Sequence, residues 1–369
     1  MSLDVVAVDT IESVNSNQWN QVVEQSDLGS VYHRYGWLRA VEFGTPYEPR
    51  HLLVSKKGNP IAIFPNFVVE SGTTPFRHLT SSKPGPGGPV AMTDEEEAVQ
   101  LLLDAVPRLC EGTIISNQIQ TSGNAYSRYH GIFEENGYDQ RLVYGDFTLD
   151  IARDWDDVRD DMHSSRRRAI RRGHDNEFEI VDEEITTETM AEFFEDFSSV
   201  MDRVEGYKRP RRFFLELANF ADRLKLFTVR IDGEQRGSLL FTLDDERSTL
   251  HYESSAVTEA HFEYNASELI HEHAIKWGSE QGYDTYNFGG TDLDFRNGVF
   301  RFKEKFGARP VPALAWERGC SPFAWPAYKF ARRLYREYGD SVREYGDSVR
   351  EYGDSVREYG DSVREYVES

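Results

Sequence analysis

The stretch TYNFGGTDLDFRNGVFRFKEKFGARP, Thr285 to Pro310, combines a strand pattern with a helix pattern around a glycine pair. Its first residues alternate in polarity, and Gly289 and Gly290 then break the strand where backbone can approach a ligand closely. The residues that follow have helical spacing, which places three apolar residues on one face: Val299, Phe302 and Phe306. We therefore expect a strand, a glycine break and a short helix, and we organise the rest of the chain around them.

Two lysines lie in this helical pattern and point in different directions. Lys303 shares the apolar face, whereas Lys305 points nearly the opposite way. Lysine is rare in this chain, which has nine lysines and thirty-three arginines. The position of a lysine on an apolar face therefore requires an explanation. Two interpretations are open. The stem of Lys303 lies along the core with its ammonium in water, or the ammonium is a catalytic cation placed where negative charge develops during acyl transfer.

Length and composition predict a globular protein of two domains. The 369 residues are 39% hydrophobic and 13% aromatic, which argues against general disorder. No run of 18 apolar residues occurs, and the start MSLDVVAVDT has neither a basic nor an apolar leader region. We expect a cytoplasmic protein without a membrane span.

The charge balance is strongly acidic, with a formal net charge of −22. Such a charge repels nucleic acid and anionic membranes. This composition, with few lysines, many arginines and many carboxylates, resembles that of halophilic acidic proteins. We therefore interpret the negative charge as an adaptation to concentrated salt and not as a sign of a particular binding partner. Cys110 and Cys320 are too few for a disulfide framework, and we expect them to be reduced thiols.

The first half, residues 1–144, alternates strand and helix patterns. RHLLVSKKGNPIAIFPNFVVE, residues 50–70, predicts a β-hairpin. The segment SSKPGPGGP, Ser81 to Pro89, cannot form a helix or a central strand. It is either an ordinary connection or a rigid rim that offers backbone amides and the cation Lys83 to a substrate.

The second half, residues 145–320, repeats the alternation. It opens with a strand DFTLDI and a helix from Trp155 to Arg172, followed by two more helices and a three-strand antiparallel meander from about residue 225 to 257. A further helix starts at Asn265 and ends near Gly282. The repeated β/α pattern predicts two α/β (α+β) domains, each a mixed central sheet flanked by helices.

The helix that opens the second half carries a dense positive cluster in HSSRRRAIRRG: Arg166, Arg167, Arg168, Arg171 and Arg172. Arg166 lies on the apolar stripe and the other four spread over the remaining surface. Arginines at a helix C-terminus interact favourably with the helix dipole. The alternative is a binding site for the phosphates of a nucleotide or of RNA, because guanidinium groups match phosphate oxygens.

The tail, residues 321–369, is a separate element. From Arg336 the heptad REYGDSV occurs four times without change, and its Tyr and Val form a heptad seam. A glycine in every heptad costs about 1 kcal/mol relative to alanine, so we expect a marginal amphipathic helix. It is either a homo-oligomerisation arm or a dispensable extension.

Several of these segments together resemble one family. VYHRYGWLRAVE, SSRRRAIRRG, the meander, YNASELIHEHAIKWGSEQGYDTYNFGGT and GVFRFKEKFG are similar to the FemAB family of peptidyl and aminoacyl transferases, which belongs with BioF2-like acyltransferase domains to the GCN5-related N-acetyltransferase (GNAT) superfamily. The resemblance implies two tandem GNAT-like domains, an aminoacyl-tRNA donor and an amine acceptor on a peptidoglycan precursor. It implies that Lys303 or Lys305 stabilises the transferring ester. We expect further substrate-binding residues nearby: Gly289, Gly290, Thr291, Asp292, Tyr264, Asn265 and Arg301.

The sequence departs from CoA-dependent relatives before the helix that starts at Asn265. Such relatives have a glycine-rich turn there, whose backbone amides bind the pyrophosphate. This chain instead reads VTEAHFEYN, with Glu259 and Glu263 in that place. Acetyl-CoA is therefore disfavoured at the usual position. If the acidic composition marks a halophilic archaeon, the family's peptidoglycan acceptor does not carry over.

We therefore expect amide-bond formation by transfer of an aminoacyl or acyl group to an amine on a small molecule or peptide, in a cleft between the domains. The enzyme would supply proximity and a stabilised oxyanion. The sequence shows no recognisable set of metal-ligating residues and no pairing of a nucleophile with a histidine. We therefore expect neither a metal nor another bound cofactor. Two alternatives stay open: an acyl-CoA-dependent N-acetyltransferase, and a non-catalytic scaffold that assembles through the tail.

Overall fold

A computed structural model of the chain describes residues 3–70, 75–81, 83–204 and 206–333. The described residues divide into two units, one within residues 1–318 and one that begins at residue 319. In the second unit, residues 324–333 are helical, and the REYGDSV repeats lie outside the described residues. The expectations for the tail therefore stay predictions. No described helix is both long and apolar enough to cross a membrane.

A small antiparallel sheet lies in the first half of the chain. Its strands, in spatial order, are β1 (Leu3–Val8), β3 (His51–Lys56), β4 (Asn59–Phe64) and β7 (Val90–Ala91). The pair β3–β4 is the hairpin that the sequence predicts. The helices of this half are α1 (Ser16–Gln25), α2 (Tyr35–Gly44), α3 (Glu95–Ala105) and α4 (His130–Glu135). Helices α1 and α3 pack against the sheet.

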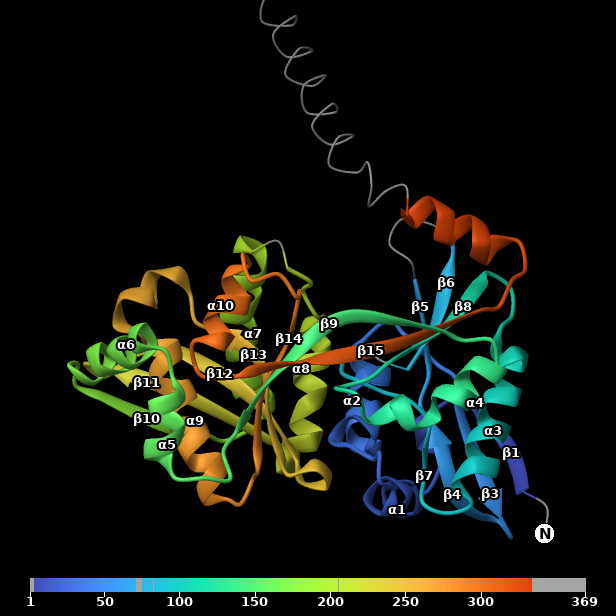
Figure 1. Ribbon diagram of the computed structural model, residues 1–369. Helices are drawn as coiled ribbons and strands as arrows, with labels where there is room; N and C mark the ends of the chain where they lie inside the picture. Colours follow the sequence, from blue (N-terminus) through green and yellow to red (C-terminus); the bar gives the residue numbers. More distant parts are fainter. Residues whose placement is uncertain (1–2, 71–74, 82, 205, 334–369) are drawn as a thin grey trace, which may run out of the picture. The chain divides into compact units, whose positions relative to one another are not determined.

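A second, eleven-stranded sheet runs through both halves (Figure 1). From one edge to the other, its strands are β10 (Phe178–Glu183), β11 (Leu224–Ile231), β12 (Glu234–Asp244), β13 (Thr249–Ala256), β14 (Thr285–Thr291), β9 (Asp139–Asp150), β15 (Arg309–Gly319), β8 (Ile114–Gln120), β6 (Arg77–Thr80), β5 (Phe67–Glu70) and β2 (Glu48–Pro49). Strands β11, β12 and β13 form the expected antiparallel meander. The mixed α/β fold class is therefore confirmed.

Strand β9 differs from the sequence expectation of a strand that begins with DFTLDI at the start of the second half. It is a single strand of twelve residues that pairs with β14 on one side and with β15 on the other. Gly145 lies within this strand, paired with Thr291 and Pro312, and a Cβ at this position would lie 2.5 Å from Cδ2 of Leu293. The domain boundary that we expect at residues 144 and 145 thus falls inside a continuous strand.

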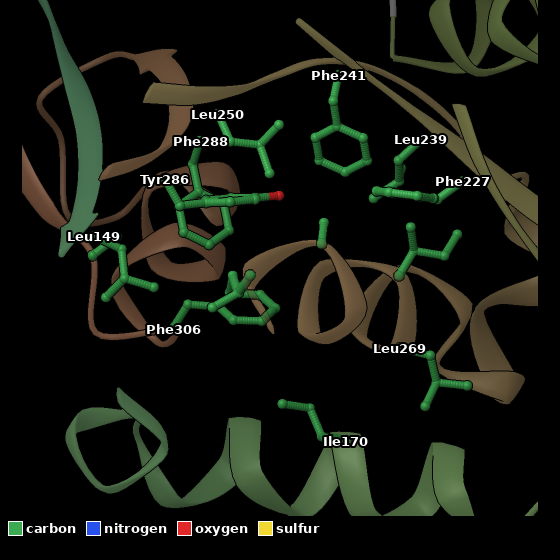
Figure 2. Close-up of a cluster of buried hydrophobic side chains, with 14 of the residues drawn as sticks. Leu149, Ile170, Phe227, Leu239, Phe241, Leu250, Leu269, Tyr286, Phe288 and Phe306 are labelled. Atoms are coloured by element: carbon green, nitrogen blue, oxygen red, sulfur yellow. The ribbon is translucent and has the colours of Figure 1, made fainter. Parts of the chain in front are cut away.

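The helices of the second half are α5 (Trp155–Asp161), α6 (Ser164–His174), α7 (Thr187–Arg203), α8 (Arg211–Leu217), α9 (Ala266–Glu280) and α10 (Gly298–Glu304). Helix α9 lies between the sheet and α6, and apolar side chains from all three form the core cluster (Figure 2). Leu149, Leu250 and Tyr286 enter this cluster from the sheet, and Leu269 and Ile170 enter it from α9 and α6.

Two sequence expectations for these helices are wrong in detail. The helix expected from Trp155 to Arg172 is broken, because Met162 and His163 are extended and the His163 ring accepts the Ser165 N–H at the start of α6. The buried face of α10 includes Lys303 as expected but not Val299. Val299 is 51% exposed, and Phe300 is buried in its place.

The two cysteines also differ from expectation. Neither Cys110 nor Cys320 is a free thiol, so the expectation of reduced cysteines is wrong. Spacing along the chain does not show whether a thiol meets a partner in the fold.

Helix packing joins the two halves of the first unit. Helix α2 from the first half packs against α8 from the second, and the backbones come close at Gly44. A Cβ at Gly44 would lie 2.4 Å from the Cα of Phe213, which is buried backbone that cannot easily move.

We predict that Gly44→Ala lowers the free energy of unfolding by about 1–3 kcal/mol, because it overpacks this helix contact. Urea denaturation measures the change. Gly131→Ala in α4 is the matched control, since no atom lies within 4 Å of its Cβ position. This control should leave stability unchanged or raise it slightly. Equal effects of the two substitutions would contradict the prediction.

Candidate active site

The polar faces of three neighbouring strands form the floor of the candidate site. Strands β13, β14 and β9 alternate in polarity, and their register aligns polar residues in rows: Thr249 beside Thr285, and His251, Asn287 and Thr148 across all three strands. The intervening residues belong to the core cluster on the α9 side. Side chains of a strand alternate between the two faces of a sheet. The face that points away from α9 is therefore polar, although it is not open to solvent.

Two adjoining cavities lie over this polar face. The first, which we call the lysine compartment, has a volume of about 320 Å³ and contains Lys303, Asp146 and Glu253 in its walls. The second, the arginine compartment, has a volume of about 260 Å³ and contains Arg247. The two share several lining residues: Tyr32, Pro86, Ser122, His251 and Asn287. Segments of the first half, among them residues 85–87 of the Pro- and Gly-rich loop, form the opposite wall.

Strand irregularities open the sheet at the lysine compartment. The pairing of β13 with β14 ends at His251 and Asn287, and Glu253 is an extra residue of β13 opposite β12. On β14 the register against β9 shifts between Asn287 and Gly290. Gly289 has φ +73°, which favours glycine. These bulges turn backbone carbonyls toward the cavity instead of toward a neighbouring strand.

The Lys303 ammonium donates hydrogen bonds to these backbone carbonyls. Its Nζ donates hydrogen bonds of 2.9 Å to the oxygens of both Gly289 and Gly290, and the residue is only 5% exposed. Burial lowers the pKa of Lys303 to about 8, although the Asp146 carboxylate has the opposite effect. Helix α10 presents this side chain, and the Asn297 side chain caps its first turn by accepting the N–H of Val299 at 2.8 Å.

Asp146 is the second buried charge of the lysine compartment. Its carboxylate accepts the Ser122 hydroxyl at 2.8 Å, and the residue is 5% exposed. Burial raises the pKa of Asp146, whereas the Ser122 hydrogen bond and the charges of His251 and Lys303 lower it. Asp146 therefore lies within electrostatic range of both basic side chains.

His251 and Asp244 form a buried pair at the junction of the two compartments. The Nε2 of His251 lies 3.3 Å from Oδ2 of Asp244, and Oδ1 of Asp244 accepts the backbone N–H of Val31 at 3.1 Å. Val31 belongs to the first half, so residues of both halves hold the pair in place. Such an arrangement orients an imidazole for proton transfer.

A second network closes the other side of the lysine compartment. Arg209, from the segment between α7 and α8, forms an ion pair of 2.6 Å with Glu253. The Tyr32 hydroxyl donates to the same carboxylate at 3.1 Å. Burial raises the pKa of Tyr32 well above its ordinary value, with the Glu253 charge adding to this effect, so the phenol stays a donor.

The structure brings some of the sequence-predicted residues together and separates others. Lys303, Gly289 and Gly290 share the lysine compartment. Lys305 is half-buried outside its lining, and its carbonyl accepts the N–H of His163. Six further predicted residues lie outside the lining of both compartments: Lys83, Tyr264, Asn265, Thr291, Asp292 and Arg301. Arg301 donates to the Phe295 carbonyl, and the Tyr264 ring lies under the guanidinium of Arg236.

The arginine cluster is divided between the interior and the surface. Arg166 is buried, pairs with Glu268 of α9, and lies over the rings of Phe302 and Phe306 at 4.3 and 4.4 Å. Its guanidinium therefore takes part in packing α6, α9 and α10 together. The other four arginines remain available at the surface: Arg167, which is half-buried and donates to the Asp160 carbonyl, and the exposed Arg168, Arg171 and Arg172.

Sequence reasoning missed the acidic and imidazole groups of the site: Asp146, Asp244, His251 and Glu253. The signal was present as strict alternation in DFTLD and TLHYE, where polar side chains occupy every second position of strands that have central places in the sheet. Among the described residues, no group of three or more His, Cys, Asp or Glu side chains is placed to hold a metal ion.

Comparison with known proteins identifies the second half of the chain. Residues 156–304 match the acetyltransferase (GNAT) domain family. This segment is a GNAT domain. The GNAT domain includes strands β13 and β14, helices α9 and α10, and Lys303, while Asp146 and the opposite wall of the site come from outside the matched segment. The sequence finds no match among curated proteins.

Solved structures extend the likeness from the GNAT domain to most of the chain. FemX superposes with a TM-score of 0.66 at 13% identity, over 88% of this chain and 99% of FemX. L-PGS from Bacillus licheniformis gives 0.55 at 13% identity over 82% and 92%. A tandem GNAT protein from the clavulanic acid biosynthesis pathway gives 0.53 at 10% identity over 87% and 99%. The resemblance to FemAB-type tandem GNAT folds is thus confirmed.

We predict that Lys303 titrates near pH 8, whereas an exposed lysine titrates near 10.4. Because burial disfavours the charged form, the ammonium is present below pH 8 and is lost as the pH rises above it. Nitrogen-15 NMR of labelled lysine side chains measures the midpoint, and the spectrum of Lys303→Met assigns the signal. A midpoint near 10 would show that this side chain is not desolvated.

Proposed function

We propose that the protein transfers an aminoacyl or acyl group to an amine, with formation of an amide bond in the lysine compartment. The observation that carries the proposal is the buried ammonium of Lys303. Its Nζ is fixed by two backbone carbonyls, and it lines a cavity that also holds carboxylates and an imidazole. The GNAT domain supports acyl transfer as the class of reaction.

In the proposed reaction the neutral amine nitrogen attacks the carbonyl carbon of an ester or thioester. A C–N bond forms, the carbonyl oxygen becomes negatively charged, and the Lys303 ammonium stabilises that charge. The C–O or C–S bond then breaks and the leaving group takes up a proton. The proton from the amine passes to a base, for which His251, oriented by Asp244, and Asp146 are placed in the same compartment.

We propose an aminoacyl ester as the donor. The turn before α9 supports this choice, because Glu259 to Tyr264 form a 3-10 helix there and Asn265 adopts a left-handed conformation at the start of α9. Relatives that bind CoA place a glycine-rich turn at this position. In this proposal the surface arginines of α6 contact the phosphates of an aminoacyl-tRNA, as charge-assisted hydrogen bonds to phosphate favour arginine.

An acyl-CoA donor is the second candidate, and the match to the acetyltransferase family favours it. The two donors are distinguished by incubating the protein with a mixture of primary amines and either an aminoacyl-tRNA or acetyl-CoA. Mass spectrometry then detects the amide product. Product from the tRNA alone supports the proposed donor, and product from acetyl-CoA alone overturns it.

We predict that Lys303→Met reduces kcat by about 10²–10³, the effect of removing one oxyanion donor. Methionine keeps the length of the side chain but has no charge. Lys305→Met is the matched control, since Lys305 lies outside the compartment lining, and it should keep nearly wild-type activity. Circular dichroism checks that both variants are folded. A folded Lys303→Met protein with full activity would exclude the proposed role.

A further inference from the structure

The turn between β12 and β13 points to a second ligand group. Residues 244–247 read Asp, Asp, Glu, Arg. The three acidic residues are each committed to a partner: Asp244 to His251, Asp245 to Arg223 and Glu246 to Arg34. Arg247 differs from them, because its guanidinium forms no hydrogen bond or ion pair with any described residue. It is solvent-exposed and lines the arginine compartment.

No acidic side chain that lines the arginine compartment is paired with Arg247 among the described residues. Its charge acts on His33 and Tyr126, which lie in the same compartment. Burial lowers the pKa of His33 to about 4, so its imidazole is neutral at pH 7. Leu28 and Ala125 add apolar surface to the walls. The acidic residue in these walls is Asp244, which is already bonded to His251 and to the Val31 N–H.

The adjoining lysine compartment has the complementary character for an amine. Asp146 and Glu253 line it together with the cations Lys303 and Arg209. Glu253 is already paired with Arg209, so Asp146 is the carboxylate that remains for an ammonium group, and His251 lines both compartments. Buried carboxylates attract an ammonium group, and the imidazole can accept its proton before the attack. One compartment therefore presents the Asp146 carboxylate, and the other presents the guanidinium of Arg247, which has no hydrogen-bond or ion-pair partner among the described residues.

We propose that the acceptor is a small amine that also bears a carboxylate. Its amine lies in the lysine compartment beside His251 and Asp146, and its carboxylate is bound by Arg247 in the arginine compartment. Volumes of about 320 and 260 Å³ suit a molecule of amino-acid size. This inference rests on the proposed function and specifies its substrate.

The test compares acceptors that differ only in the carboxylate: γ-aminobutyrate and γ-aminobutyramide, and likewise β-alanine and its amide. With wild-type protein, kcat/KM should be about tenfold or more higher for the acids, because charge-assisted hydrogen bonds are roughly twice as strong as neutral ones. Arg247→Gln should remove this preference mainly by raising KM for the acids, with the amides unaffected. Arg247→Lys, which keeps the charge, should restore part of it.

A control variant and a binding measurement separate this inference from the proposed function. Arg230→Gln removes an arginine of β11 that pairs with Glu183 and lies outside both compartments, and it should keep the preference for acids. Calorimetry without donor should show that wild-type protein, and not Arg247→Gln, binds γ-aminobutyrate. Binding without transfer would overturn the proposed function alone. Transfer with equal kcat/KM for acids and amides would overturn this inference alone.

Discussion

The pairing of β9 with β14 on one side and β15 on the other is the constraint on which the rest of the structure depends. It joins strands of both halves into one sheet, so the hydrogen bonds of β9 hold Asp146 in register with Gly290 of the GNAT domain. The first half then covers the polar face of β13, β14 and β9. A polar face that would otherwise be solvated becomes the floor of an enclosed site.

Three charged side chains of the lysine compartment, Lys303, Asp146 and Glu253, are largely shielded from solvent, and each has a defined partner. Lys303 bonds to two carbonyls, Asp146 accepts the Ser122 hydroxyl, and Glu253 pairs with Arg209. Burying a charge is costly unless hydrogen bonds and opposite charges compensate for the lost water. Several of these partners, such as Ser122 and Val31, come from the first half. The network is therefore satisfied only when both halves are folded together, and such a concentration of buried ionisable groups is typical of functional sites.

The spacing of polar and apolar residues was sufficient to predict features that depend on one short stretch of the sequence. The hairpin of β3 and β4, the antiparallel meander and the inward direction of Lys303 all follow from periodicity over a few residues. The same spacing did not predict features that depend on packing between elements far apart in the sequence. Arg166 was expected as one member of a phosphate-binding cluster, but Glu268 and two phenyl rings from other helices enclose it. The break between α5 and α6 and the exposure of Val299 are further outcomes of packing.

The sequence by itself determined the fold class, the order of the elements, the glycine break at Gly289 and Gly290, and the lysine that follows it. These properties depend on the spacing of neighbouring residues, which the sequence displays directly. Only the tertiary structure decided which polar residues meet. Asp146, His251 and Lys303 lie on different elements, and strand register together with the covering first half brings them to one cavity. Proximity between residues far apart in sequence is a property of packing, because no local periodicity encodes it.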